Sequence, residues 1–365
     1  MPAAGRHHRG HIVSAGQTLD PNVPGIGLTG CGIISQCLLE GAELAGIPIR
    51  AVCDVDREKA ARAAQRVGAR VRETYEELLA DPDIQAVIIA LPNDAHYFAA
   101  LQALDAGKHV FCEKPLTTSA AQSLEVARRA EASGLVFQMG YMKRFNPAFS
   151  AVKQRLHQIA PVTTASFRLT VSGDPVLEGP GREPSSWHAD IKRAGGGFLV
   201  HSGSHLLDLM MFYFGLPEAV WGSLRRDASG NEYTNSFMFR FPDGLYVSLQ
   251  MVQTRARGLG YAGSTWEEIV EVNGVNGRLA ARGADWMGKI PPRATFHPAD
   301  GEGPRELFTF WESQWAEEMK AFVTGIAEGR CLGSTAADGY RVDYVLEQLK
   351  RLENESGALE LRYEL

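Results

Sequence analysis

Two glycines after a short apolar segment have the spacing of a phosphate-binding turn. The letters GCGIIS at residues 30–35 follow an apolar run and open a stretch with helical spacing. The first glycine permits a tight bend, the second lets the backbone approach a pyrophosphate, and a small third residue, here Ser35, packs helix against strand. The helix N-terminus adds free N–H groups. The predicted dinucleotide contacts in this turn are Gly30, Gly32, Ile33 and Ile34.

A carboxylate stands where such a site reads the ribose. Asp54 ends the next β-branched run, 24 residues beyond Gly30. A carboxylate there accepts hydrogen bonds from both ribose hydroxyls and repels a 2′-phosphate, so NAD is the predicted cofactor. Two alternatives stay open: Asp54 caps the following helix, or Arg57 accommodates a phosphate.

Strands and helices alternate through the first part of the chain, which is typical of βαβ units. We expect strands at 25–30, 49–55, 86–91, 109–112 and 135–140, and helices at 33–45, 57–67, 75–79, 95–106 and 120–132. Parallel strands linked by helices form a sheet covered on both faces. The pattern predicts an α/β Rossmann domain over residues 24–146, preceded by a flexible extension over residues 1–23.

The second part contains more strands and fewer helices. We expect strands at 162–172, 219–225, 236–241, 245–252, 268–272, 278–281 and 359–363, and helices at 199–214, 311–328 and 336–354. Turn signals such as Asn273-Gly274 separate neighbouring strands. The prediction is a C-terminal α+β domain over residues 147–365 with a large, mainly antiparallel open sheet.

Further motifs resemble the glucose–fructose oxidoreductase, inositol dehydrogenase and rhizopine-catabolism family (Gfo/Idh/MocA). They are ALPN at 90–93 with His96, GKHVFCEKP at 107–115, QMGYMKRFNP at 138–147, and GGG at 195–197 followed by His201, Gly203, His205 and Asp208. The resemblance covers residues 24–365. It implies a hydroxyl of a pyranose, inositol or related compound as the reacting group. It also implies a sheet whose free face packs against another subunit, giving a homodimer or homotetramer.

The resemblance assigns roles to individual residues. Lys114 matches the family's active-site lysine, and His205 matches its acid–base histidine. The cofactor contacts that it adds are Leu91, Pro92, Asn93, His96, Glu113, Lys114 and Pro115. Oxidation of a secondary alcohol needs a base for the hydroxyl proton and a donor for the developing alkoxide, which a neutral His205 and the Lys114 ammonium can supply.

One position departs from the family's pattern. His201 stands four residues before His205, where an aspartate is usual. The two imidazoles are expected to share one helix face, with Asp208 fixing the tautomer of His205. Three roles for His201 stay open: contact with a substrate hydroxyl or leaving group, a structural role, or metal binding with His205 and His188. No acidic third ligand is evident, so no metal is predicted.

Aromatic and basic residues near these motifs are candidates for sugar binding. The predicted substrate contacts are Lys114, Tyr141, Arg144, Trp187, His188, His201 and His205. Tyr141, Trp187 and Tyr213 either stack on a sugar face or pack in the core. An anionic or sulfonated sugar would suit Lys143, Arg144, Arg168, Lys192 and Arg193, the alternative being ordinary surface solvation.

Composition narrows the classes of function. The net charge is −6 and the basic residues are scattered, which argues against nucleic acid as a partner. No apolar run has the length of a membrane span, and five cysteines without metal-type spacing suggest a reducing, cytoplasmic location.

The leading hypothesis is a sugar or polyol dehydrogenase. The alternatives are a glycoside hydrolase that oxidises, eliminates, adds water and reduces while NAD stays bound, and a non-catalytic sensor, against which intact Lys114 and His205 argue.

Overall fold

The computed structural model describes residues 23–172, 187, 190–226, 230, 232–308, 312–352 and 357–365. The expected N-terminal extension lies outside these residues apart from Val23, and so does His188.

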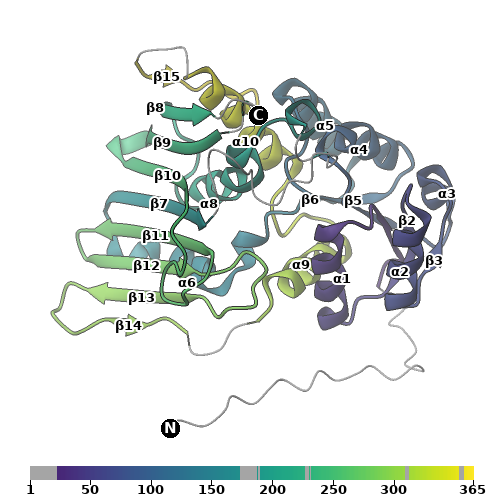
Figure 1. Cartoon of the computed structure of the whole chain (residues 1–365), viewed down its shortest axis with the longest axis horizontal. Coiled ribbons are helices and arrows are strands. Elements are labelled where there is room, and N and C mark those ends of the chain that lie inside the picture. Colours follow the sequence, from purple (N-terminus) through teal and green to yellow (C-terminus); the bar gives the residue numbers. More distant parts are fainter. Residues whose placement is uncertain are drawn as a thin grey trace, which may run out of the picture.

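The first sheet has six parallel strands in the order β3-β2-β1-β4-β5-β6 (Figure 1). They are β1 (Ile26–Thr29), β2 (Ile49–Cys53), β3 (Arg70–Val71), β4 (Ala86–Ile89), β5 (His109–Cys112) and β6 (Phe137–Met139). Helices α1 (Ile33–Ala45), α2 (Arg57–Val67), α3 (Tyr75–Ala80), α4 (His96–Asp105) and α5 (Ala120–Ser133) connect them. The central strands β1 and β4 are buried along their whole length, as a sheet covered on both faces requires. The predicted Rossmann fold is confirmed.

Local capping fixes where these helices begin and end. The side chain of Asp56 accepts hydrogen bonds from the N–H groups of Glu58 and Lys59, so Asp56, not Asp54, caps α2. Gly46 ends α1 in the left-handed conformation, with φ at 70°. The alternative role of Asp54 as a helix cap is therefore excluded.

The second sheet has nine strands in the order β14-β13-β12-β11-β7-β10-β9-β8-β15. They are β7 (Val162–Ser172), β8 (Ala219–Arg226), β9 (Glu232–Arg240), β10 (Tyr246–Thr254), β11 (Trp266–Gly274), β12 (Gly277–Gly283), β13 (Arg293–Pro298), β14 (Arg305–Glu306) and β15 (Leu359–Glu360). Among the described strands of this sheet, only β7 and β10 pair in parallel. The predicted mainly antiparallel sheet is confirmed, and the structure adds β13 and β14.

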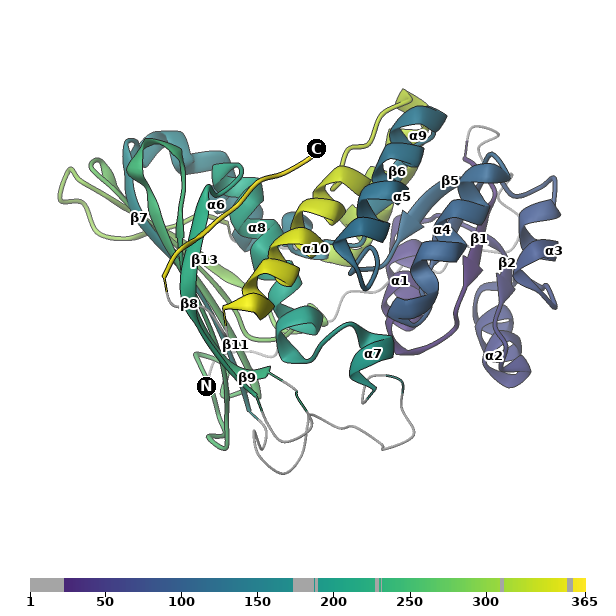
Figure 2. The same ribbon diagram turned by 90° about the horizontal axis from the view of Figure 1, so that it is seen from above.

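Helices that follow the Rossmann domain in the sequence cover one face of the second sheet. Figure 2 shows α6 (Pro147–Ile159), α8 (Ser204–Phe214) and α10 (Ala336–Arg351) on the side of the second sheet that faces the Rossmann domain. No described helix covers the opposite face of that sheet. Because α8 and α10 lie between the sheets, residues at their ends reach the carboxyl edge of the Rossmann sheet.

Helix α9 (Gln314–Glu328) returns from the C-terminal part of the chain to the first sheet. The Phe322 ring meets the Phe111 ring edge to face at 5.7 Å, and Gly41 of α1 lets the backbone of Trp315 approach. The expected division at residue 146 stays a prediction, but α9 packs with the Rossmann domain.

Short elements carry the connecting loops. They are the 3-10 turns η1 (Asn93–Ala95), η2 (Met142–Phe145) and η5 (Pro242–Gly244), the helix α7 (Ile191–Ala194), and a π-helical turn, η4 (Leu199–Gly203). The expected helix over 199–214 thus begins with a π turn, an irregularity often found at functional sites. No helix in the described ranges is long and apolar enough to cross a membrane.

Candidate active site

The glycine-rich turn has the geometry that its sequence predicts. Gly30 has φ at +86°, and a Cβ there would lie 2.3 Å from the carbonyl oxygen of Ala90. A Cβ on Gly32 would meet nothing within 4 Å, so that glycine leaves open space beside the helix N-terminus. Ser35 is fully buried, and its hydroxyl donates to the Gly32 carbonyl at 2.6 Å. This open space at an N–H-rich turn fits the pyrophosphate of a dinucleotide.

Asp54 holds the same turn from the end of β2. Its carboxylate oxygens accept from the backbone N–H groups of Cys31 at 2.6 Å and Asp56 at 2.7 Å. Ile33 and Val55 beside it are apolar but 76% and 104% exposed. A partly exposed carboxylate flanked by uncovered apolar side chains fits a ribose and its base. Arg57 pairs instead with Glu73 at 3.0 Å on the exposed surface.

His96, a predicted cofactor contact, is buried between two loops. Its ring is fully buried, with Nδ1 2.7 Å from the Pro115 carbonyl oxygen and Nε2 2.9 Å from the Leu91 carbonyl oxygen. The ring therefore joins the loop after β4 to the loop after β5. The first of these loops carries Leu91 and the second carries Lys114, directly before Pro115. The contact of His96 with the cofactor stays a prediction.

The side chain of Asn93 binds a backbone group of the second domain, and its contact with the cofactor stays a prediction. Its side-chain amide is 3% exposed and donates to the Ala194 carbonyl at 2.8 Å, so it spans the two domains. Of the same loop, Leu91 and Pro92 remain partly exposed at the carboxyl end of β4, where parallel sheets bind ligands.

Glu113 is a buried carboxyl directly beside the candidate catalytic lysine. Burial raises its pKa to about 7, against the opposing effect of the Lys114 charge. One oxygen accepts from the Lys114 backbone N–H at 3.2 Å. Gly140 leaves room for the carboxyl, because a Cβ at that glycine would lie 2.9 Å from Oε1.

Lys114 reaches across the domain boundary to the π turn η4, which precedes α8. Its ammonium donates to the backbone carbonyl of His201 at 2.9 Å. Burial lowers the pKa of Lys114, and Glu113 opposes this shift. The contact brings the ammonium to the turn that precedes His205.

His205 is 7% exposed and lies edge to face against the Tyr141 ring at 6.0 Å. Burial lowers its pKa well below the ordinary value, and the charges of Lys114 and Lys143 lower it further. The imidazole is therefore neutral at physiological pH, the form that accepts a proton. Its Nδ1 has no hydrogen-bond partner within the described part of the chain.

His201 contributes both its backbone carbonyl, which accepts from Lys114, and its ring to the site. Its ring meets the Trp187 ring at 6.0 Å, which brings two predicted substrate residues together. Among the described residues there is no group of three or more His, Cys, Asp or Glu that could hold a metal. The metal hypothesis also involved His188, which lies outside those residues.

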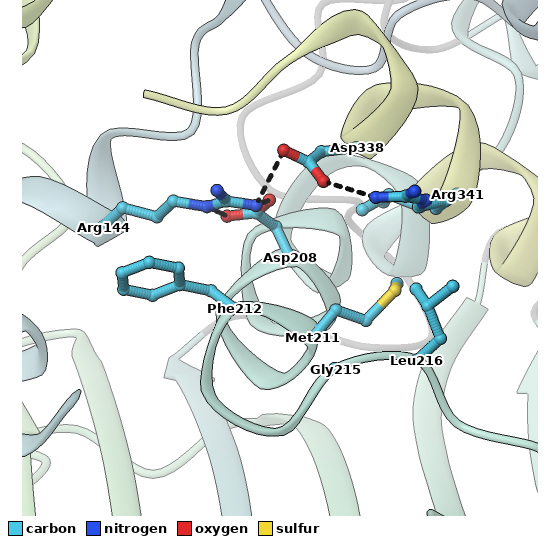
Figure 3. A pocket seen from close by; sticks show the side chains of 9 residues that line it. Arg144, Asp208, Met211, Phe212, Gly215, Leu216, Asp338 and Arg341 are labelled. Atoms are coloured by element: carbon cyan, nitrogen blue, oxygen red, sulfur yellow. Dashed lines mark hydrogen bonds and ion pairs between the residues drawn. The ribbon is translucent and has the colours of Figure 1, made fainter. Parts of the chain in front are cut away.

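Asp208 does not fix the tautomer of His205, and that prediction is wrong. Its carboxylate accepts from Arg144 Nε at 2.9 Å and Nη2 at 2.7 Å. Figure 3 shows the Arg144 side chain directed at this carboxylate, with Asp338 and Arg341 forming a second ion pair above it. Burial raises the pKa of Asp208 to about 6, and Arg144 opposes the shift. Arg144 is thus held by a buried carboxylate, and its contact with a substrate stays a prediction.

The other residues considered for an anionic sugar are mostly paired. Lys143 forms a fully buried ion pair with Glu268. Arg168 and Arg193 form ion pairs with Glu267 at 3.6 Å and Asp94 at 2.8 Å.

The three tyrosine and tryptophan candidates differ in their exposure. Tyr213 is buried, and its hydroxyl donates to the Phe149 carbonyl at 2.5 Å, which makes it a core residue. Tyr141 is fully buried. Of the three, only Trp187 keeps a partly exposed ring.

Two residues at the site were missed from the sequence. Glu232 accepts from the Gly197 N–H at 2.7 Å, and Lys350 donates to the Gly195 carbonyl. They lie on β9 and α10, far along the chain from the glycines that they hold. The available signals were weak: Glu232 is the first residue of a strand, and Lys350 is one of several charged residues on a helix.

A Rossmann domain with an open phosphate-binding turn, together with a lysine and a neutral histidine at its carboxyl edge, defines a dinucleotide-dependent oxidoreductase. Residues 25–141 match the oxidoreductase family model with an NAD-binding Rossmann fold, and residues 159–280 match the Gfo/Idh/MocA C-terminal domain. The chain belongs to the Gfo/Idh/MocA family and is an NAD-dependent oxidoreductase.

Two relatives align along most of their length. The chain is 28% identical over 330 residues to the inositol 2-dehydrogenase of Acidothermus cellulolyticus, covering 86% of this chain and 88% of that protein. It is 26% identical over 345 residues to the levoglucosan dehydrogenase of Pseudarthrobacter phenanthrenivorans, covering 81% and 85%.

Solved structures share the fold. A levoglucosan dehydrogenase in complex with NADH and levoglucosan superposes with a TM-score of 0.80 at 22% identity, covering 93% of this chain and 99% of that one. An oxidoreductase domain protein from Kribbella flavida gives a TM-score of 0.80 at 24% identity, with 93% and 100% covered.

Proposed function

We propose that this protein is an NAD(H)-dependent dehydrogenase that moves hydride to or from a secondary hydroxyl of a sugar, sugar derivative or polyol. The observation that carries the proposal is the approach of Lys114 Nζ to the His201 carbonyl, 2.9 Å away and one turn before the buried His205. A cation and a neutral base thus meet at the carboxyl edge of the Rossmann sheet, where the nicotinamide end of a dinucleotide is expected.

Different residues would bind the cofactor, orient the substrate hydroxyl and accept its proton. NAD, when bound, supplies the hydride acceptor. The open turn at Gly32 would hold its pyrophosphate, and Asp54 would hold the adenosine ribose. The Lys114 ammonium orients the substrate hydroxyl and stabilises negative charge on its oxygen. The neutral imidazole of His205 accepts the hydroxyl proton.

Asp54 favours NAD over NADP. Its carboxylate is fixed at both oxygens by the N–H groups of Cys31 and Asp56, so it cannot turn away from a 2′-phosphate without losing two hydrogen bonds. The one basic residue expected to accommodate such a phosphate, Arg57, is engaged by Glu73.

The relatives suggest where to look for the substrate. Two aligned proteins are named for inositol and levoglucosan, a cyclitol and an anhydrosugar. A cyclic polyol with adjacent secondary hydroxyls suits Lys114 as a donor and Trp187 as a stacking face.

A redox-neutral glycosidase is the second candidate. Its chemistry needs an additional acid–base group near the anomeric carbon, and the His201 imidazole lies at the site against Trp187. No carboxylate occupies position 201, which is the feature that separates this chain from the simple dehydrogenase pattern.

The free face of the second sheet supports the expected homodimer or homotetramer. The rings of Trp221 on β8 and Tyr246 on β10 meet edge to face at 5.7 Å across β9, and Tyr246 is 44% exposed. Light scattering of the wild type and of Tyr246→Lys would test this, since a like charge on both copies should weaken the association. The cytoplasmic location stays a prediction.

The experiment follows NADH absorbance and aglycone release together. Purified protein is incubated with cyclitols, anhydrosugars, free pyranoses and aryl pyranosides, each with NAD or NADP. Steady NADH formation without aglycone supports the dehydrogenase. Aglycone released over many turnovers without net NADH supports the glycosidase. If neither NADH nor aglycone forms, both candidate functions are contradicted.

A further inference from the structure

One segment of the substrate domain is held by side chains from both domains. It runs over residues 194–201, from the end of α7 through three glycines to the π turn. Its peptide groups bind four side chains: Asn93 and Lys114 from the Rossmann domain, and Glu232 and Lys350 from the second domain. We call residues 194–201 the bridging segment.

The glycines give this segment a shape that other residues do not take. Gly195 has φ at +77° and Gly196 has φ at +153°, and a Cβ on Gly196 would lie 2.5 Å from the Val200 side chain. The chain can therefore turn sharply and present successive carbonyl and N–H groups to opposite sides. The His201 N–H closes the turn by donating to the Gly197 carbonyl at 3.0 Å.

On the side of the second domain the segment is fixed by buried charges. Glu232 is 1% exposed and receives both the Gly197 N–H at 2.7 Å and Arg226 Nη1 at 3.2 Å. Hydrogen bonds to a buried carboxylate are strong, because the charge has no water to replace them. This anchor depends only on the second domain, so it exists whatever the state of the cofactor site.

On the side of the Rossmann domain the anchors are part of the cofactor loops. Asn93 follows Leu91 and Pro92 after β4, and its amide donates to the Ala194 carbonyl at 2.8 Å. Lys114 follows β5 and donates to the His201 carbonyl at the other end of the segment. These two loops are therefore joined directly to the two ends of the segment that precedes His205.

We propose that Asn93 is a positioning residue that couples the dinucleotide-binding loop to the bridging segment, so that bound NAD(H) orders the sugar site. This rests on the proposed function for its account of catalysis, but not for the coupling itself. It predicts that NADH slows backbone hydrogen exchange in the bridging segment. Asn93 would then act on sugar turnover without being a cofactor ligand.

The test uses two variants and a neighbouring control in the full chain. Asn93→Asp keeps the shape but removes the donor N–H, and Asn93→Ser keeps a small polar group in case the carboxylate impairs folding. Asp94→Asn is the control, because Asp94 lies beside Asn93 but pairs with Arg193 on the surface. Three quantities are measured: NADH Kd by fluorescence, hydrogen exchange by mass spectrometry with and without NADH, and sugar kcat and KM.

The coupling predicts a specific combination of results. Both Asn93 variants should exchange faster in the bridging segment, and NADH should no longer slow that exchange. NADH Kd should stay within about threefold of the wild type, while kcat/KM for the sugar falls by about 10- to 100-fold, as misplacement of a catalytic group predicts. The control should change none of these by more than about threefold, as expected for an exposed ion pair.

Other results overturn the coupling. A rise in NADH Kd of more than tenfold with unchanged exchange in the segment would make Asn93 a direct cofactor ligand. Unchanged exchange and unchanged kinetics would show that the hydrogen bond from Asn93 to the Ala194 carbonyl has no role in turnover. If the wild type oxidises no sugar, the proposed function fails, while hydrogen exchange and NADH binding still decide on the coupling.

Discussion

The guanidinium of Arg144 binds the Asp208 carboxylate through two parallel hydrogen bonds, from Nε at 2.9 Å and Nη2 at 2.7 Å. The pair is nearly buried, with the two side chains 11% and 0% exposed. It joins the η2 turn of the Rossmann domain to α8 of the second domain. It therefore fixes the helix that carries His205, although Asp208 does not touch the histidine.

Loss of the cation should destabilise the protein rather than weaken sugar binding. Arg144→Gln leaves the Asp208 carboxyl buried without its cationic partner, which should cost about 3–5 kcal/mol in the free energy of urea unfolding at pH 7.5. Arg128→Gln is the control, since its pair with Glu364 is exposed. A stable Arg144→Gln protein with a much higher sugar KM would show instead that Arg144 binds substrate.

The two glycines of the phosphate-binding turn should fail in different ways. Gly30→Ala places a methyl 2.3 Å from a carbonyl oxygen at positive φ, so it should lower Tm and reduce soluble yield. Gly32→Ala meets no atom within 4 Å and should fold normally, but its methyl would occupy the space expected for the pyrophosphate. NADH titration of Gly32→Ala should show a Kd raised by about tenfold or more. Equal NADH affinity would contradict the assigned phosphate site.

Glu318 should make the protein less stable as pH rises. It is fully buried on α9, and neither carboxyl oxygen has a partner within the described residues. Burial raises its pKa well above the usual value, and Glu113 and Asp208 add to the shift. Below about pH 4 the folded and unfolded states both hold the proton. Above that pH the unfolded state ionises first, so stability falls until the folded carboxyl ionises too.

The matched variant for this effect is Glu318→Gln, which keeps the shape but does not titrate. It should equal the wild type in unfolding free energy near pH 4 and exceed it by about 1–3 kcal/mol at pH 8. Glu317→Gln on the neighbouring, partly exposed position is the control. A wild type whose stability advantage over Glu318→Gln grows with pH would mean that Glu318 is ionised and paired in the folded state.

Lys114 should matter for turnover far more than for cofactor binding. Lys114→Met removes the donor to the alkoxide, so kcat/KM for the sugar should fall by about 10²–10⁴-fold while NADH Kd changes little. The remaining activity should have its acid limb at higher pH, because the Lys114 charge helps to lower the pKa of His205. An unchanged acid limb would show that the Lys114 charge does not lower the pKa of the group that accepts the proton.

The parts of the fold that repeat a pattern could be predicted from the sequence. Alternating strands and helices identified the Rossmann sheet, and β7 (Val162–Ser172) has the bounds that its alternation indicates. The edge strand β3 has two residues, too few to show a period. β13 has one buried position among exposed and half-buried ones, in no regular order, so it gave no strand signal.

Contacts between distant segments could not be predicted. The helix spacing favoured Asp208 as the partner of His205, three residues away. The structure gives Asp208 to Arg144, which is 64 residues earlier, because two parallel hydrogen bonds from a guanidinium satisfy a buried carboxylate better than one from an imidazole. The bond from Lys114 to the His201 carbonyl spans 87 residues and involves a backbone group, which no side-chain pattern reveals.

The most direct test of the central claim is the fate of the hydrogen on the reacting carbon. A cyclitol or sugar that the enzyme accepts is labelled with deuterium at that carbon and incubated with NAD, and the nicotinamide is examined by proton NMR. A dehydrogenase that uses Lys114 and His205 as described predicts net NADH carrying one deuterium at C4, with the ketone as product. Product formed with no deuterium on accumulated nicotinamide would contradict the account.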